Sequence, residues 1–320
     1  MKKYFLIFAL LGTGLMFCGC EPGKDATKPA DTAEIMEDQF QPQYGEKDPI
    51  ALNDAKTGGT FTTWGGSFPK SLNMFLDYNR FSATVMGLLY EPLLSLHSTD
   101  NKPVGVLAES WEIAEDEMTF TFKIRKDATW SDGEPVTSAD IQFYYDVMLD
   151  PKNLTSLFRV SLKRFERPVA LDDKTVVIKA NTKHWNNFYQ AGNMVALPAH
   201  IWKGKDFNKI NFDFPVVSGP YQIGEVKKGR SISLKRRHDW WGRLNRYNAG
   251  KYNFQKIVYL SMTDRNKALE AFKKGIFDAY PIYTSSIWMK KTQFDQVEKG
   301  WVVRQAVYNQ EPKGYQGLAV

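Results

Sequence analysis

The stretch from residue 118 to residue 150 constrains the fold most, because it holds a strand, a turn and a capped helix in succession. Apolar and polar residues alternate over 119–125, as in a strand with one buried face. The pair Asp132-Gly133 is typical of a tight turn. Thr137 and Asp140 then form a capping box, with Asp in place of the usual Glu or Gln. This order of elements is typical of a fold that mixes α and β structure.

The polar residues of this stretch all have a structural explanation. Trp130 lies at the strand end, where its large ring can close the corner between sheet and helix. We therefore interpret the cluster as a structural corner and not as a catalytic loop. The following helix should bury one apolar face, formed by Ile141, Tyr144, Tyr145 and Met148.

Other segments add strands and helices without a fixed-period repeat. Asp264 is a good N-cap, and Gly275 is a good C-terminal stop for the helix between them. About 260 residues follow the N-terminal region, which is more than one core usually organises, so we expect at least two subdomains. Further strands are expected at 58–65, 175–180, 231–236 and 256–262, and a further helix at 82–89.

The N-terminal residues have the features of an export signal. Residues 1–19 combine two lysines with an apolar run that is too short to span a bilayer. The sequence from Phe17 to Cys20 resembles a bacterial lipobox, although Phe17 departs from the usual Leu. The alternative is an ordinary signal peptide with incidental cysteines. We expect lipidation of Cys20, followed by a polar tether over 20–57. The protein would then be anchored to a membrane, in the periplasm or at the cell surface.

Cysteine content and charge exclude several classes of function. Cys18 and Cys20 are the only cysteines, so cleavage before Cys20 would leave no disulfide, thiol nucleophile or thiolate metal site. The net charge is +6, and residues 227–246 hold eight Lys or Arg around Trp240-Trp241. Such a segment could bind single-stranded nucleic acid. The alternative for this segment is a solvated hairpin with a packed Trp corner. Because the protein is expected to be exported, we favour the hairpin and expect no nucleic acid partner.

Four ordered motifs carry a family resemblance. The segment "VGVLAESWEIAEDEMTFTFKIRKDATWSDGEPVTSADIQFYYDVMLDPKN" resembles the signature region of the extracellular solute-binding proteins, family 5, of ABC importers. The motifs "SGPY" (218–221), "HDWWG" (238–242) and "ALEAFKKGIFDAY" (268–280) follow in the family's order. Two further segments, "FDFPVVSGPY" and "NAGKYNFQKI", are most similar to an oligopeptide branch that includes microcin C-binding proteins.

The resemblance implies an α/β fold of the periplasmic-binding-protein type II kind, with two lobes that enclose a ligand. The chain would form lobe I over 58–310, with an inserted subdomain at about 82–195. A hinge strand would occupy 311–320, and the second lobe would be missing, as in a fragment or a truncated gene product. The implied function is capture of an oligopeptide or peptide-like solute by a monomer, without a cofactor, and its delivery to ABC permease subunits.

The resemblance also suggests two walls of a ligand cleft. The first follows the first strand, and the second follows the helix that ends near Gly275. For any one of these residues, an ordinary loop or packing role is the alternative. The candidate ligand-binding residues are Tyr78, Asn79, Arg80 and Phe81 in the first wall, and Tyr280, Ile282, Tyr283 and Thr284 in the second.

The alternative function is that of an enzyme, namely a cell-envelope lipoprotein hydrolase that acts on peptides. The adjacent pair His238-Asp239 could supply half of a triad. No His-Glu-x-x-His pattern and no Gly-x-Ser-x-Gly elbow occur in the sequence. We therefore expect a binding protein and not an enzyme.

Overall fold

The computed structural model describes residues 55–77, 79–213 and 215–306, with the side chain of Arg80 left out of the description. The expected signal peptide (1–19), lipid acceptor Cys20, nearly all of the tether, candidate residue Tyr78 and the expected hinge strand (311–320) lie outside these residues.

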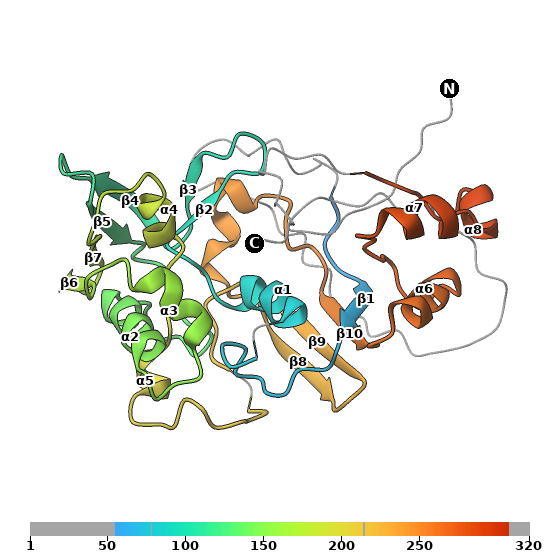
Figure 1. Ribbon diagram of the computed structural model, residues 1–320, viewed down its shortest axis with the longest axis horizontal. Helices are drawn as coiled ribbons and strands as arrows, with labels where there is room; N and C mark the ends of the chain where they lie inside the picture. The colour runs from blue at the N-terminus through green and yellow to red at the C-terminus, as the bar shows by residue number, and fades with distance from the viewer. Residues whose placement is uncertain (1–54, 78, 214, 307–320) are drawn as a thin grey trace, which may run out of the picture.

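A four-stranded sheet forms the centre of the molecule, with the order β1 (Thr60–Gly66), β10 (Lys256–Ser261), β9 (Ser231–Arg236), β8 (Tyr221–Lys227). β1 and β10 run parallel, and the other pairs are antiparallel. Helix α1 (Arg80–Leu89) lies across this sheet (Figure 1). The sequence predicted all three of the strands β1, β9 and β10 and, within two residues, the start of α1.

A second sheet of four antiparallel strands lies on the left of Figure 1, with the order β4 (Ala108–Ile113), β5 (Thr119–Ile124), β7 (Thr175–Lys179), β6 (Val169–Asp172). The predicted alternation of β5 is confirmed, since Phe120 and Phe122 are buried and pack against Phe188 of α4 (Asn187–Gly192). The other helices on this side are α2 (Ser138–Leu149), α3 (Ser156–Leu162) and α5 (Ala199–Trp202).

The expected boundaries of lobe I and of its inserted subdomain stay predictions. Helix α1 contacts β1 and β8 of the central sheet. Its early start has a local cause: Asn79 is its N-cap, and Asn79 Oδ1 accepts a hydrogen bond from Ser82 N at 3.1 Å. The hairpin of β2 (Leu94–Leu96) and β3 (Pro103–Gly105) then leads toward the second sheet.

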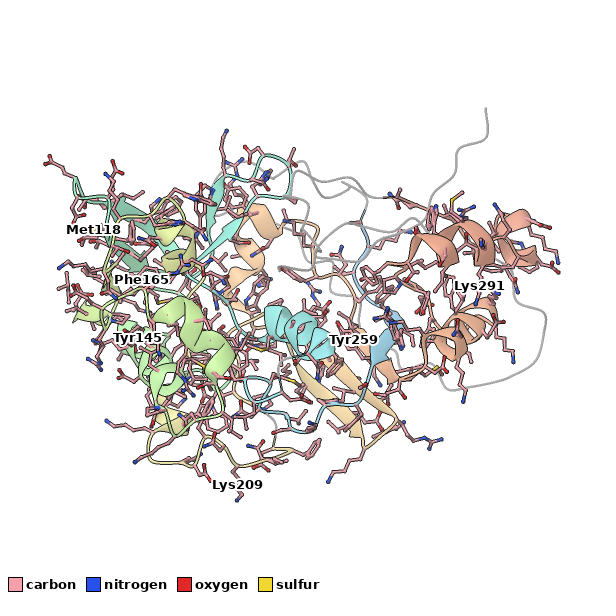
Figure 2. All side chains as sticks on the ribbon, viewed as in Figure 1. Met118, Tyr145, Phe165, Lys209, Tyr259 and Lys291 are labelled. Carbon is pink, nitrogen blue, oxygen red and sulfur yellow. The ribbon has the colours of Figure 1, made fainter. Side chains whose placement is uncertain are left out.

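The corner predicted at Trp130 is confirmed. Trp130 is fully buried, and its Nε1 donates to Asp140 Oδ2 at 3.3 Å. The same oxygen accepts the Thr137 amide at 2.8 Å, as the capping box requires. Asp140 Oδ1 accepts the Ala199 amide at 3.0 Å. One carboxylate thus joins the turn, α2 and α5. Figure 2 shows Tyr145 of α2 close to Phe165, whose carbonyl accepts the Tyr145 hydroxyl at 2.6 Å.

The basic stretch at 227–246 begins at the end of β8 and contains β9 and the short turn η1 (Trp241–Leu244), and it ends at the first residue of a second turn, η2 (Arg246–Asn248). Arg237 is buried, and its Nη1 donates to the carbonyls of Val217, Ser218 and Gly219, each at 3.1 Å. Trp240 is buried as well. Two residues at the centre of this stretch therefore have packing roles, as the hairpin interpretation requires.

Glu91 is a buried acid at the end of α1. Its Oε1 accepts Trp240 Nε1 at 3.2 Å, and its amide donates to Ser218 Oγ at 3.0 Å. Burial raises the pKa of Glu91 to about 8, against smaller lowering effects from Trp240 and Arg237. The carboxyl group is therefore mainly protonated at neutral pH.

The C-terminal helices α6 (Arg265–Lys273), α7 (Ser285–Lys291) and α8 (Asp295–Glu298) lie together on the right of Figure 1. The predicted cap and stop of α6 are confirmed: Asp264 Oδ1 accepts the amides of Asn266 and Lys267, and Gly275 has a φ of 72°. Within the described ranges, we find no helix with the length and apolar character needed to cross a bilayer.

Candidate functional site

Three parallel segments end at one edge of the central sheet. β1 and β10 are paired from Thr60 with Lys256 onward, and Thr63 also bridges Ala279 in parallel. The Asp278 amide donates to the Thr62 carbonyl at 2.8 Å. The carboxyl ends of β1, β10 and the segment at 278–280 therefore meet at the same edge.

The segments that follow β1 and β10 leave this edge on opposite faces of the sheet. Successive residues of a strand point to opposite faces. Phe61 and Tyr259 join the core that includes α1, whereas Trp64 and Leu260 pack with the cluster of α6. Figure 2 shows Tyr259 beside α1 in the centre of the molecule. A change of face between neighbouring parallel strands creates a crevice outside their carboxyl ends, where open α/β sheets bind ligands.

The second wall expected from the sequence forms a small pocket at this edge. Tyr280 is buried and its ring lies 5.5 Å from that of Trp64, while its hydroxyl donates to the Arg265 carbonyl at 2.9 Å. Tyr283 is 44% exposed. The pocket is lined by Trp64, Arg265, Tyr280, Pro281, Ile282, Tyr283, Thr284 and Ile287. The structure thus brings together all four candidates of this wall.

The first wall is not brought to the same pocket. Phe81 is buried on the α1 face, with its ring 5.4 Å from that of Tyr259. Asn79 caps α1 through its side chain, as described above. Arg80 is the first residue of α1. Because Tyr259 and Trp64 lie on opposite faces, Phe81 and Tyr280 are separated by the sheet. A ligand-binding role for Tyr78, Asn79, Arg80 and Phe81 stays a prediction.

Four pocket residues are not among the sequence candidates: Trp64, Arg265, Pro281 and Ile287. Trp64 Nε1 donates to the Met262 carbonyl at 2.7 Å, which fixes the indole at the end of β10. The available signal was the alternation of β1, which gives Trp64 the face opposite to Phe61. Its neighbour Gly65 permits the close approach of Tyr259, since a Cβ at Gly65 would lie 3.1 Å from Tyr259 Cβ.

The pocket offers aromatic and hydrogen-bonding groups rather than a charged cluster. Burial raises the pKa of Tyr280, so its hydroxyl remains a neutral donor at physiological pH. At the start of α6, backbone amides of Lys267 and Asn266 lower the pKa of Asp264 and keep it ionised. No group of three or more His, Cys, Asp or Glu side chains with metal-binding geometry occurs among the residues that the structure describes.

The suggested half-triad does not form. His238 Nε2 contacts Gln255 Nε2 at 3.2 Å, and Asp239 pairs with Arg237 at 3.4 Å. A different pair is close: His200 Nε2 lies 2.7 Å from Asp132 Oδ2 at the Trp130 corner. The Ser131 hydroxyl beside it accepts the Val217 amide at 3.1 Å, which is a structural use of that group.

Comparisons with known proteins agree on one family. A family model described as bacterial extracellular solute-binding proteins, family 5 Middle, matches residues 102–318. The probable peptide-binding protein YejA of Agrobacterium fabrum is 29% identical over 262 residues. That match covers 79% of the present chain and 41% of YejA, so the chain spans less than half of this relative.

Solved structures show the same fold. AgaA from A. tumefaciens R10, solved in complex with agropinic acid, is 30% identical with a TM-score of 0.60, and the match covers 69% of this chain and 43% of AgaA. The oligopeptide-binding protein AppA from Bacillus subtilis, solved with a nonapeptide, has a TM-score of 0.62 at 21% identity. That match covers 74% of this chain and 47% of AppA. At this identity AppA supports the fold alone, which confirms the expected α/β architecture.

Proposed function

We propose, because the chain belongs to the bacterial extracellular solute-binding proteins of family 5, that it binds a peptide or peptide-like solute for an ABC importer. A member of an extracellular family acts outside the cytoplasm, in the periplasm or at the cell surface. The proposed partners are the solute and the permease subunits of the importer, and the proposed binding unit is a monomer. The name of YejA, a probable peptide-binding protein, supports the peptide class.

The observation that carries this proposal is the pocket at the carboxyl edge of β1 and β10. Tyr283 is partly exposed there, beside the fixed rings of Trp64 and Tyr280. Aromatic faces with hydroxyl groups can pack against side chains of an extended peptide and hydrogen-bond to its backbone. The pocket has a volume of only about 10 Å³ and presents apolar surface beside the hydroxyl groups of Tyr283 and Thr284.

The proposal includes a lipid anchor at Cys20, which lies outside the described residues. Cys20→Ser removes the thiol that would carry the lipid, so the variant should move to the aqueous phase in detergent partitioning. Wild type should remain in the detergent phase, because each buried methylene of an acyl chain contributes about 0.8 kcal/mol. Equal partitioning of the two proteins would contradict the anchor.

Mass spectrometry of small molecules released from the purified protein tests the function. A binding protein should release an intact peptide-like solute and rebind it without change. A peptide hydrolase would return cleaved products from the same solute, and that outcome would overturn the assignment as a binding protein. A protein that holds no solute and binds none from a peptide library would also contradict the proposal.

A further inference from the structure

A second hollow lies where the beginning of β4, the end of β5 and the turns η1 and η2 meet. In Figure 1 these turns are the light-orange coils beside β2 and β3. None of its residues belongs to the edge described above, so the inference is independent of the proposed function. The hollow has a volume of about 460 Å³ and is lined by Glu109, Ser110, Arg125, Asn245, Arg246 and Tyr247.

The inner wall of this hollow is held in place by several contacts. Arg125 is 7% exposed, its Nε donates to the Val106 carbonyl at 2.9 Å, and its guanidinium lies 6.0 Å from the ring centre of Trp241. Asn245 is also buried, and its Oδ1 accepts the Tyr247 amide at 3.0 Å. The site is therefore preformed and does not need a rearrangement to bind a ligand.

Arg246 is the residue that points to a ligand. Its guanidinium lies 5.2 Å from the ring centre of Tyr247. Its Nε is buried and has no hydrogen-bond partner among the described residues. Arg246 also lines the hollow and is only half-buried, so its guanidinium supplies a positive charge that an incoming anion would meet.

Charge limits the class of that ligand. Two guanidinium groups and one carboxylate, that of Glu109, leave the hollow with one net positive charge. The planar fork of arginine binds a carboxylate through two parallel hydrogen bonds. A carboxylate group therefore matches the arginines of the lining in charge and in shape.

Size and shape narrow the class further. Pockets for small organic molecules have volumes of about 300–1,000 Å³, and the hollow lies within this range. The Tyr247 ring and the alkyl stem of Arg246 add apolar surface beside the charges. We propose that this hollow binds a small organic monocarboxylate with a flat or apolar body, with its carboxylate against Arg246 and its body against Tyr247.

Fluorine NMR of 4-fluorobenzoate with the purified protein tests the proposal. The probe signal should broaden and shift in a saturable way. Arg246→Gln should weaken this binding by about tenfold or more, since a charge-assisted hydrogen bond contributes about 1.5–3 kcal/mol. Arg243→Gln is the matched control, because it removes the same charge from the exposed part of η1 and should leave the affinity unchanged within about twofold.

Ser110→Glu provides a second variant that does not depend on the folding of η2. Ser110 is exposed, and a carboxylate at this position should repel the probe and remove its binding. Absence of saturable binding to wild type, or equal binding to wild type and Arg246→Gln, would overturn the proposal. Competition adds a test of ligand class: acetate should displace the probe, whereas displacement by inorganic phosphate and not by acetate would overturn the assignment to carboxylates.

Discussion

The corner at Trp130 and the edge at 280–284 use their polar and aromatic residues in opposite ways. At the corner, Asp140 accepts four hydrogen bonds, from the Thr137 amide and hydroxyl, the Trp130 indole and the Ala199 amide. At the edge, Tyr283 and Thr284 are exposed beside a pocket. Side chains enclosed in the protein cannot reach a solute, whereas side chains exposed on a fixed support can.

Trp130→Ala should give the largest effect that separates the two regions. The indole is fully buried, so its loss should lower the free energy of unfolding by about 3–5 kcal/mol. Trp185→Ala is the matched control, because Trp185 is 78% exposed and should change stability by less than about 0.5 kcal/mol. Denaturant unfolding measures both. Equal effects of the two substitutions would contradict the structural role of the corner.

Glu91→Gln should change how the free energy of unfolding depends on pH. The pKa of Glu91 is raised from 4.5 to about 8, so its contribution to stability is complete below pH 4.5 and is lost as pH rises toward 8. The wild-type unfolding free energy should therefore fall relative to that of the variant by up to about 1.4 kcal/mol per pH unit in this window. Unfolding curves from pH 5 to pH 8 measure the difference.

Glu112→Gln is the control for that experiment. Glu112 is exposed on β4, and its substitution should preserve the wild-type slope. Arg237, Trp240, Trp241, Ser218 and Tyr252 surround Glu91, and the tyrosine does not titrate in this range. If Glu91→Gln has the same slope as wild type, the carboxyl group is not protonated in the folded protein.

Asn79→Ala should have a smaller effect on stability. Loss of the bond from Ser82 N to Asn79 Oδ1 should lower the free energy of unfolding by about 1 kcal/mol. Thr284→Ala is a useful contrast, since Thr284 is the N-cap of α7 but makes no side-chain cap bond. Thermal unfolding should separate them. A larger loss in Thr284→Ala than in Asn79→Ala would contradict this assignment of caps.

Local features of the structure were predictable, and long-range features were not. The strand at 119–124 and the capping box at Thr137 depend on residues close together in sequence, so the local sequence pattern predicts them. The pocket depends on the parallel bridge between Thr63 and Ala279, which are 216 residues apart. No local pattern gives this pairing, which explains why Trp64 was missed.

The candidate site illustrates the same limit. Tyr280 to Thr284 came from a family resemblance, and the structure groups them at one pocket. The resemblance also suggested Phe81, but the pairing of β10 with β1 places its packing partner Tyr259 on the face opposite to the pocket. The sequence contains both segments, while their separation by the sheet follows only from strand pairing.

Calorimetric titration with the solute recovered from the protein tests the central claim, that the edge binds and the corner supports. Tyr283→Ala should weaken binding by about 1–2 kcal/mol with little change in melting temperature, because an exposed ring is lost. Thr137→Ala should lower stability by about 1 kcal/mol and leave the affinity of the folded protein unchanged. Wild-type affinity in Tyr283→Ala, together with lost affinity in a folded Thr137→Ala variant, would contradict the account.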